Sequence, residues 1–210
     1  MQASDWLDRW EQNNIGWHQS KVNRRLRDWW HVAPPASVLV PLCGKTLDLL
    51  WLFERGHDVT GVELSSLASA AFFEENAIAH TRRTVDSFEL FEADSGRLRI
   101  YCGDYFEFGG GPFDAVFDRG ALVALDADLR PRYAAHTATL LVARPEQLLL
   151  TVDYDQSRVA GPPFSVPPDE VLRYWPALGS MLAFNAIEEV PPKFKEGGLT
   201  TVTENVWRSP

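Results

Sequence analysis

The segment from Val38 to Glu63 constrains most strongly how this chain can fold. An apolar run at 38–42 meets a tight turn at 43–45, and a helical pattern of leucines begins directly afterwards. A second apolar run ends in Glu63, which lies 21 positions after Leu42. This order is typical of a nucleoside-binding βαβ unit, in which the first turn faces the charged part of the ligand and the acid accepts hydrogen bonds from ribose hydroxyls. The segment therefore predicts an α/β fold.

The glycine content of the first turn indicates which nucleoside it can hold. Gly44 is the one glycine in that turn, so the G-x-G-x-x-G cradle for a dinucleotide pyrophosphate is missing. This argues against a nucleotide-dependent oxidoreductase. A nucleoside without phosphates fits better, and we expect the cofactor to be S-adenosyl-L-methionine.

Length and charge restrict the domain organisation and the partners. The 210 residues suit a single domain, 1–210, with an N-terminal segment at 1–33 and an α/β core at 37–210. The formal net charge of −9 disfavours docking on nucleic acid or on an anionic membrane, because attraction to phosphate needs a positive face. We therefore expect a small-molecule substrate and, since nothing demands an assembly, a monomer.

Cysteine usage and the N-terminal residues favour the cytoplasm. Cys43 and Cys102 each lie in an apolar run without a C-x-x-C motif, so we expect two reduced, mostly buried thiols. Polar, charged and aromatic residues follow Met1, and no apolar stretch approaches the ~20 residues of a membrane span.

Apolar periodicity alternates between strands and helices along the core. Strands are expected at 37–42, 57–64, 113–117 and 147–152, a hairpin or two short strands at 88–91 and 98–102, and two weaker strands at 182–190 and 199–207. Helices are expected at 45–55, 65–76, 130–143 and 169–174, with Gly56 at a left-handed cap and Ser65 or Ser66 as an N-cap. This order predicts the Rossmann-like fold of S-adenosylmethionine-dependent methyltransferases, with a mostly parallel seven-stranded sheet and an antiparallel edge hairpin.

The N-terminal segment is rich in tryptophan and predicts a helical lid. It holds five of the eight tryptophans: Trp6, Trp10, Trp17, Trp29 and Trp30. Trp29 and Trp30 are expected only to dock the segment onto the core. Trp6 is compatible with docking and with ligand contact. Trp10 and Trp17 border a polar, turn-like run at 12–16, where a loop would close over a ligand and stack on an adenine or on a flat substrate.

Five short motifs in order carry a resemblance to a known family. They are Trp17-His18-Gln19, Pro41-Leu42-Cys43-Gly44-Lys45, Gly56-His57-x-Val59-x-Gly61-Val62-Glu63, Asp118-Arg119-Gly120-Ala121-Leu122-Val123-Ala124 and Gly161-Pro162-Pro163-Phe164-x-Val166. Together they resemble the thiopurine S-methyltransferase family, and its bacterial branch most closely, from about residue 6 to about residue 176. The resemblance implies methyl transfer from S-adenosyl-L-methionine to thiopurines and to selenium or tellurium compounds.

The resemblance also implies roles for particular residues. The positions that match the cofactor site of the family are Trp10, Leu42, Glu63 and Arg119, with Gly103-Asp104 at the adenine end. Trp17 matches an aromatic residue near the acceptor. Lys193 stands where some members have an arginine implicated in binding thiopurines, and a lysine offers a point charge instead of a planar fork.

The residues at the expected strand ends allow more than one interpretation. Glu63 can accept both ribose hydroxyls, or it can be a solvated acid beside a helix N-terminus. Leu42 offers backbone groups while its side chain packs as a core leucine. Asp104 receives the adenine amino group or is an ordinary turn acid. Arg119, our candidate catalytic residue, binds the cofactor carboxylate or an anionic acceptor, or it forms an ion pair with Asp118 or a neighbouring acid. Neighbouring residues on a strand point apart, which disfavours the pair with Asp118.

The acceptor side is expected to lie in the second half of the chain. Tyr154 follows a strand and is expected to face the substrate, and Gly161-Pro162-Pro163-Phe164 is expected to form a rigid wall of the acceptor pocket. No histidine or cysteine accompanies Asp153 and Asp155, so we expect no metal there. A thiol reacts as its thiolate, so His18 is not needed as a general base. Holding the reactants in line then provides most of the rate gain.

Two other functions remain compatible with these residues. The first is a halide or small-thiol methyltransferase on much of the same scaffold. The second is a non-catalytic nucleoside-binding protein, against which the complete set of Trp10, Leu42, Glu63 and Arg119 argues.

Overall fold

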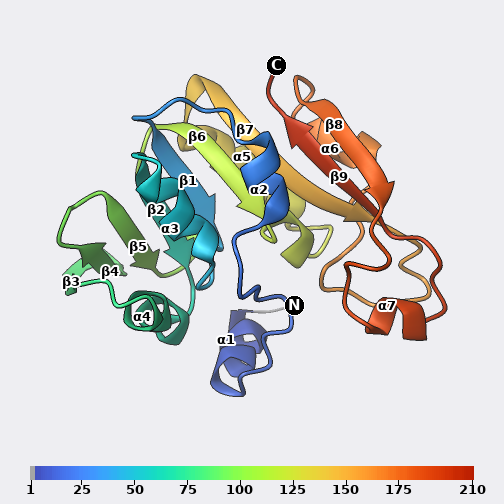
Figure 1. The fold of residues 1–210 in the computed structure, drawn as a ribbon, viewed down its shortest axis with the longest axis horizontal. Helices are drawn as coiled ribbons and strands as arrows, with labels where there is room; N and C mark the ends of the chain where they lie inside the picture. The colour runs from blue at the N-terminus through green and yellow to red at the C-terminus, as the bar shows by residue number, and fades with distance from the viewer. Residues whose placement is uncertain (1–2) are drawn as a thin grey trace. The chain divides into compact units, whose positions relative to one another are not determined.

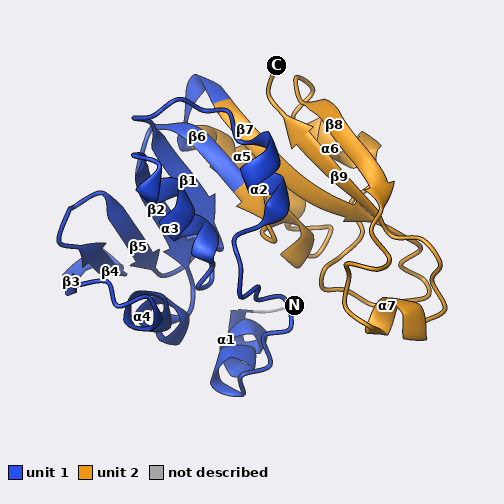
Figure 2. Ribbon diagram, viewed as in Figure 1, with its two compact units in different colours: residues 1–117, 140–145 blue, residues 118–139, 146–210 orange. Residues whose placement is uncertain are grey.

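The computed structural model describes residues 3–210, and the chain divides into two compact units (Figure 2). Unit 1 comprises residues 1–117 and 140–145, and unit 2 comprises residues 118–139 and 146–210. Residues 1 and 2 of the predicted lid segment lie outside the described part. We describe each unit by itself, and two strands, β6 (Phe113–Arg119) and β7 (Leu141–Asp153), contribute residues to both.

The centre of unit 1 is a set of parallel strands that forms because their sequences are apolar on both faces. In the order β5-β2-β1-β6, these are β5 (Leu98–Cys102), β2 (Asp58–Glu63), β1 (Ser37–Pro41) and β6 (Figure 1). Almost every residue of β1 and β2 is buried, as expected for strands covered on both sides. The register places Glu63 opposite Cys102, so the carboxyl ends of β2 and β5 are neighbours.

Two further strands extend this sheet, and the expected number of seven strands was wrong. β4 (Phe88–Ala93) pairs antiparallel with β5, which confirms the expected hairpin, and β3 (His80–Val85) pairs antiparallel with β4. Together with β7 and two further C-terminal strands, the described residues contain nine strands. The sequence did not reveal β3 because its four central residues are all exposed, so no alternation of apolar and polar positions marks it.

The helices of the crossover connections begin and end close to the expected positions. Helix α3 (Leu47–Glu54) is capped by Thr46, whose hydroxyl accepts from the Asp48 N–H at 3.3 Å, and it is followed by Gly56 with φ +94°. Helix α4 (Ser66–Glu75) is capped by Ser65, whose hydroxyl accepts from the Ala68 N–H at 3.2 Å. The left-handed glycine and the serine cap are thus confirmed.

The N-terminal segment contributes two helices to unit 1, α1 (Ala3–Glu11) and α2 (Arg24–Trp29). Directly after α2, Trp30 is 8% exposed and its indole N–H donates to Nε2 of His57 at 3.2 Å. The Trp30 ring also meets Phe117 edge-on, with ring centroids 6.5 Å apart. The docking role expected for Trp30 is therefore confirmed.

Unit 2 contains the C-terminal strands and three helices. β7, β9 (Thr203–Arg208) and β8 (Gly179–Asn185) pair antiparallel in that order, as the expected edge hairpin requires. The helices are α5 (Arg130–Thr139), α6 (Pro168–Tyr174) and α7 (Lys193–Glu196), and two 3₁₀ turns lie at Tyr105–Glu107 in unit 1 and at Leu122–Ala124 in unit 2. The expected helix at 130–143 was too long, because the apolar residues from Leu141 onward already belong to β7. Within residues 3–210, no helix combines the length and the apolarity of a membrane span.

The glycine in the middle of β2 is required by the packing beneath it, which gives the first prediction. A Cβ at Gly61 would lie 2.6 Å from Sγ of Cys43 and 3.3 Å from side-chain carbons of Ile100 and Leu49. Because overpacking a full core forces neighbours to shift, Gly61→Ala should lower the free energy of unfolding by about 1–3 kcal/mol. Urea unfolding followed by circular dichroism measures this change.

Gly109→Ala is the matched control, because a Cβ there meets nothing within 4 Å. Adding Cys43→Ala to Gly61→Ala should recover part of the lost stability. Equal unfolding midpoints for Gly61→Ala and the unchanged protein would contradict this account of the core.

Candidate active site

The first turn of unit 1 follows β1 and has an unusual backbone. Leu42 has φ +46° and Gly44 has φ +55°, so two residues of this short turn lie in the left-handed region. A leucine there is strained, and such strain is typical of turns that serve a functional site. The Leu42 side chain is only half-buried, so the expectation of a core leucine was wrong. Leu42 lies one residue past the end of β1, in the left-handed turn.

Glu63 is held at the end of β2 by two backbone groups. Glu63 is 7% exposed. Its Oε2 accepts from the Gly44 N–H at 2.7 Å, and its Oε1 accepts from the Ser65 N–H at 2.9 Å. Burial raises the pKa of this carboxyl group, and the N–H groups of Ser65, Gly44 and Leu64 oppose the increase. The alternative of a solvated acid was wrong. Each carboxylate oxygen retains acceptor capacity for one more donor, as two ribose hydroxyls require.

Tryptophans from the N-terminal segment pack onto this turn. Trp10 is 7% exposed, and a Cβ on Gly44 would lie 3.2 Å from Cζ2 of its indole, so the ring packs closely against this glycine. Trp17 meets Trp10 and Trp6 edge-on, with ring centroids 5.9 and 5.1 Å apart. The structure thus brings Trp10, Gly44 and Glu63 together, with Trp17 beside Trp10.

The end of β5 adjoins Glu63 through the backbone. The Gly103 N–H donates to the Glu63 carbonyl oxygen at 2.9 Å. Asp104 is exposed, and its Oδ1 accepts from the Phe106 N–H at 2.9 Å, so one oxygen caps the 3₁₀ turn that follows. A carboxylate has a second oxygen that a ligand amino group can reach.

In unit 2, Asp118 and Arg119 end β6, and their side chains differ sharply in environment. Asp118 is 5% exposed and accepts from the Ala121 N–H, the Leu122 N–H and the Tyr133 hydroxyl, at 3.1, 3.3 and 2.7 Å. Burial raises the pKa of Asp118 to about 6, and these hydrogen bonds oppose the increase. Arg119 is half-buried.

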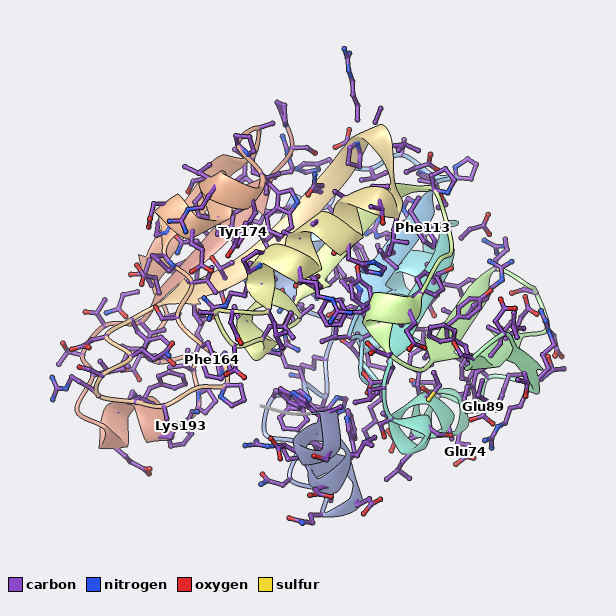
Figure 3. All side chains as sticks on the ribbon, turned by 180° about the vertical axis from the view of Figure 1, so that it is seen from behind. Glu74, Glu89, Phe113, Phe164, Tyr174 and Lys193 are labelled. Carbon is purple, nitrogen blue, oxygen red and sulfur yellow. The ribbon has the colours of Figure 1, made fainter. Side chains whose placement is uncertain are left out.

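The predicted wall at 161–164 is fixed by the residues expected to bind substrate. The Tyr154 hydroxyl donates to the carbonyl oxygen of Pro163 at 2.7 Å, and Lys193 Nζ donates to those of Ala160 and Pro162 at 3.0 and 2.7 Å. Figure 3 labels Lys193 and Phe164 in this part of unit 2. Burial raises the pKa of Tyr154 to about 12. Both side chains therefore shape this loop, and a direct contact with substrate stays a prediction.

A backbone hydrogen bond connects this wall to the segment after Arg119. The Phe164 N–H donates to the Val123 carbonyl oxygen at 2.6 Å. The buried Arg130 adds a second connection, since its guanidinium donates to the carbonyl oxygens of Leu125 and Ser165 at 3.0 and 3.1 Å. Unit 2 thus brings the Arg119 turn, Tyr154 and Lys193 into one hydrogen-bonded cluster.

Sequence reasoning missed three features of unit 2. Arg130 and Tyr133 lie in a segment that is predicted to be helical, but the sequence does not show that they bind the Leu125 and Ser165 carbonyl oxygens and Asp118. An open hollow of about 510 Å³ was also missed; its lining includes Arg158, Thr200, Thr201 and Thr203, none of which stands in a recognisable motif.

Comparisons with known proteins identify the family of this chain. A family model described as Thiopurine S-methyltransferase (TPMT) matches residues 1–209. A thiopurine S-methyltransferase of Bordetella petrii is 44% identical, covering 99% of this chain and 98% of the relative. One of Pseudomonas fluorescens (strain Pf0-1) is 43% identical with the same coverage.

Solved structures show the same fold at low sequence identity. The 1,6-didemethyltoxoflavin-N1-methyltransferase of Burkholderia thailandensis, with bound S-adenosylhomocysteine, has a TM-score of 0.64 at 18% identity over 99% of this chain and 86% of that one. The glycopeptide N-methyltransferase MtfA with S-adenosylmethionine has a TM-score of 0.58 at 16% identity over 91% and 88%. With a family model across nearly its whole length, this chain belongs to the thiopurine S-methyltransferase family and is an S-adenosyl-L-methionine-dependent methyltransferase.

Proposed function

We propose that this enzyme methylates a soft nucleophile, above all the thiol sulfur of a thiopurine or another aromatic or heterocyclic thiol. The observation that carries the cofactor part of the proposal is the buried Glu63 carboxylate, held by Gly44 and Ser65 at the turn against which Trp10 packs. The names of the relatives at about 40% identity support the choice of acceptor.

The residues of unit 1 fit the nucleoside part of S-adenosyl-L-methionine, which when bound supplies an activated methyl group on a sulfonium. Glu63 accepts the two ribose hydroxyls in charge-assisted hydrogen bonds. Trp10 packs over the Gly44 turn, and Leu42 adds backbone groups beside it. Asp104 receives the adenine amino group with the oxygen that does not cap its own turn.

On the acceptor side, the thiol binds as its thiolate. A thiolate is already deprotonated, so no residue has to take up a proton and His18 is not required. The bound cofactor would supply the methyl group to this sulfur. Arg119 binds the cofactor carboxylate or an anionic acceptor. Trp17 offers an aromatic face to a flat ring, and Tyr154 and Lys193 act by setting the 160–163 loop.

The wider assignment extends the same reasoning. Selenium and tellurium compounds are soft nucleophiles like a thiolate, and we include them among the acceptors. We assign residues 1–210 to one methyltransferase domain that acts as a monomer on small molecules and not on nucleic acid, consistent with the net charge of −9. The two free cysteines, Cys43 and Cys102, fit a reducing compartment such as the cytoplasm.

Methyl transfer from labelled S-adenosyl-L-methionine to a panel of acceptors tests this proposal. The panel contains 6-mercaptopurine, an aryl thiol, selenite, tellurite and iodide, and we expect turnover of at least one sulfur acceptor. Turnover of iodide alone would favour a halide methyltransferase. No turnover of any acceptor, with S-adenosylhomocysteine still bound, would reject the soft-nucleophile proposal.

Glu63→Gln tests the assignment of the ribose site. The amide nitrogen is a donor, so it cannot accept from Gly44 or Ser65 as the carboxylate does. Loss of a charged hydrogen-bonding partner should weaken S-adenosylhomocysteine binding by about 10- to 100-fold in calorimetry. Glu92→Gln is the matched control, because that acid pairs with Arg99 on a strand of the same sheet. Equal affinities of Glu63→Gln and the unchanged protein would refute the ribose role.

The pH dependence of binding gives an independent readout of Glu63. Because burial raises its pKa, the carboxylate protonates at a higher pH than an ordinary glutamate and then loses acceptor capacity. Affinity for S-adenosylhomocysteine should therefore be fully present above this pKa and fall as the pH is lowered through it. Glu63→Gln should lack this decrease, and an identical decrease in both proteins would assign it to another group.

A further inference from the structure

The buried carboxylate of Asp118 accepts three hydrogen bonds from other parts of unit 2. Its Oδ1 accepts from the N–H groups of Ala121 and Leu122, and its Oδ2 accepts from the hydroxyl of Tyr133, which is 1% exposed on α5. One carboxylate thus joins the end of β6, the 3₁₀ turn at Leu122–Ala124 and helix α5.

These hydrogen bonds enclose Arg119. The two bonds to Oδ1 run from the residue before Arg119 to residues two and three positions after it, so they close a short loop around the arginine. Gly120 completes this loop with φ +93°, a conformation that side chains rarely adopt. Side chains alternate along a strand, so Asp118 points inward while Arg119 points to the other side.

Keeping an ionised carboxylate buried opposes folding. Burial raises the pKa of Asp118 to about 6, so near neutral pH the folded protein holds a charge that it would hold more easily in water. Apolar residues of similar volume often serve stability better than a buried charge. The burial of this charge therefore counts against a purely stabilising role for Asp118.

We propose that Asp118, oriented by Tyr133, is a positioning residue that fixes the backbone and the direction of Arg119. The inference rests on the proposed function, in which Arg119 binds the cofactor or the acceptor. Tyr133 acts on Arg119 indirectly, through Asp118. Its hydroxyl donates to Oδ2 and so orients the carboxylate, and Oδ1 then accepts from the N–H groups of Ala121 and Leu122.

Tyr133→Phe and Asp118→Asn test this role, with Tyr174→Phe as the matched control. Tyr174 also lies in unit 2 (Figure 3), and its hydroxyl also donates to a carboxylate, Oε1 of Glu170, at 2.9 Å. S-adenosylhomocysteine affinity by calorimetry and the kcat and KM for 6-mercaptopurine are measured for each variant. Whichever constant Arg119→Ala changes, Tyr133→Phe should change the same one by about five- to tenfold, as expected for a hydrogen bond to a charged group. Tyr174→Phe should change neither.

A double-mutant cycle separates positioning from a general structural role. If Tyr133 acts through Arg119, adding Tyr133→Phe to Arg119→Ala should change the affected constant by less than about twofold, because the two effects are not independent. If Tyr133 only stabilises unit 2, its effect should be the same in both backgrounds, and this result would overturn the inference. Asp118→Asn should repeat the pattern, because it changes the carboxylate to which the Tyr133 hydroxyl donates.

The cycle also distinguishes failure of the inference from failure of the proposed function. An Arg119→Ala protein with unchanged affinity and unchanged kinetic constants would remove the role of Arg119, and the inference with it. An impaired Arg119→Ala protein beside a Tyr133→Phe protein that acts independently would refute the positioning role alone.

Discussion

The hydrogen bonds that Glu63 accepts from Gly44 and Ser65, at 2.7 and 2.9 Å, hold the ligand-facing edge of unit 1 together. Parallel strands such as β1 and β2 are joined by long crossover connections, so no hairpin fixes their carboxyl ends to each other. The backbone ladder pairs Pro41 with Val62, and beyond it the Glu63 carboxylate joins the turn after β1 to the start of α4. Trp10 rests on that same turn, and the position of α1 therefore depends on it. The group that orders the edge is also the group best placed to meet a nucleoside.

The crossover unit could be predicted from the sequence because its signals are local. Two apolar runs, a turn and an acid at a fixed spacing predict Glu63 at a strand end, where the structure places it. The partners of Glu63 could not be predicted, since they depend on the backbone of the turn and on Leu42 at φ +46°. β3 was missed because its sequence has no local signal of this kind. The strand is polar on both faces, so it has no hydrophobic period, and its polar side chains form cross-strand ion pairs such as Arg82 with Glu89.

Unit 2 shows a different limit of prediction. Tyr154 was expected to face the substrate because it follows a strand, and Lys193 was expected to bind substrate because of the family resemblance. The structure gives the Tyr154 hydroxyl and two donors of Lys193 to backbone carbonyl oxygens of the 160–163 loop. A sequence shows which groups can donate, but their partners are set by contacts between segments far apart in the chain. These hydrogen bonds fit the expected stiffening of the loop, and the roles of the two side chains toward substrate stay predictions.

Glu63 and Asp118 show how the same physical situation serves two purposes. Both end a strand, both are almost fully buried, and burial raises the pKa of both. A carboxylate offers about four acceptor positions. At both residues backbone N–H groups occupy part of this capacity, and at Asp118 the Tyr133 hydroxyl takes a further share. Because a buried charge opposes folding in either place, each is best explained by what a neutral side chain could not do. We propose that at Glu63 that task is to bind a diol, and that at Asp118 it is to fix the residue beside it.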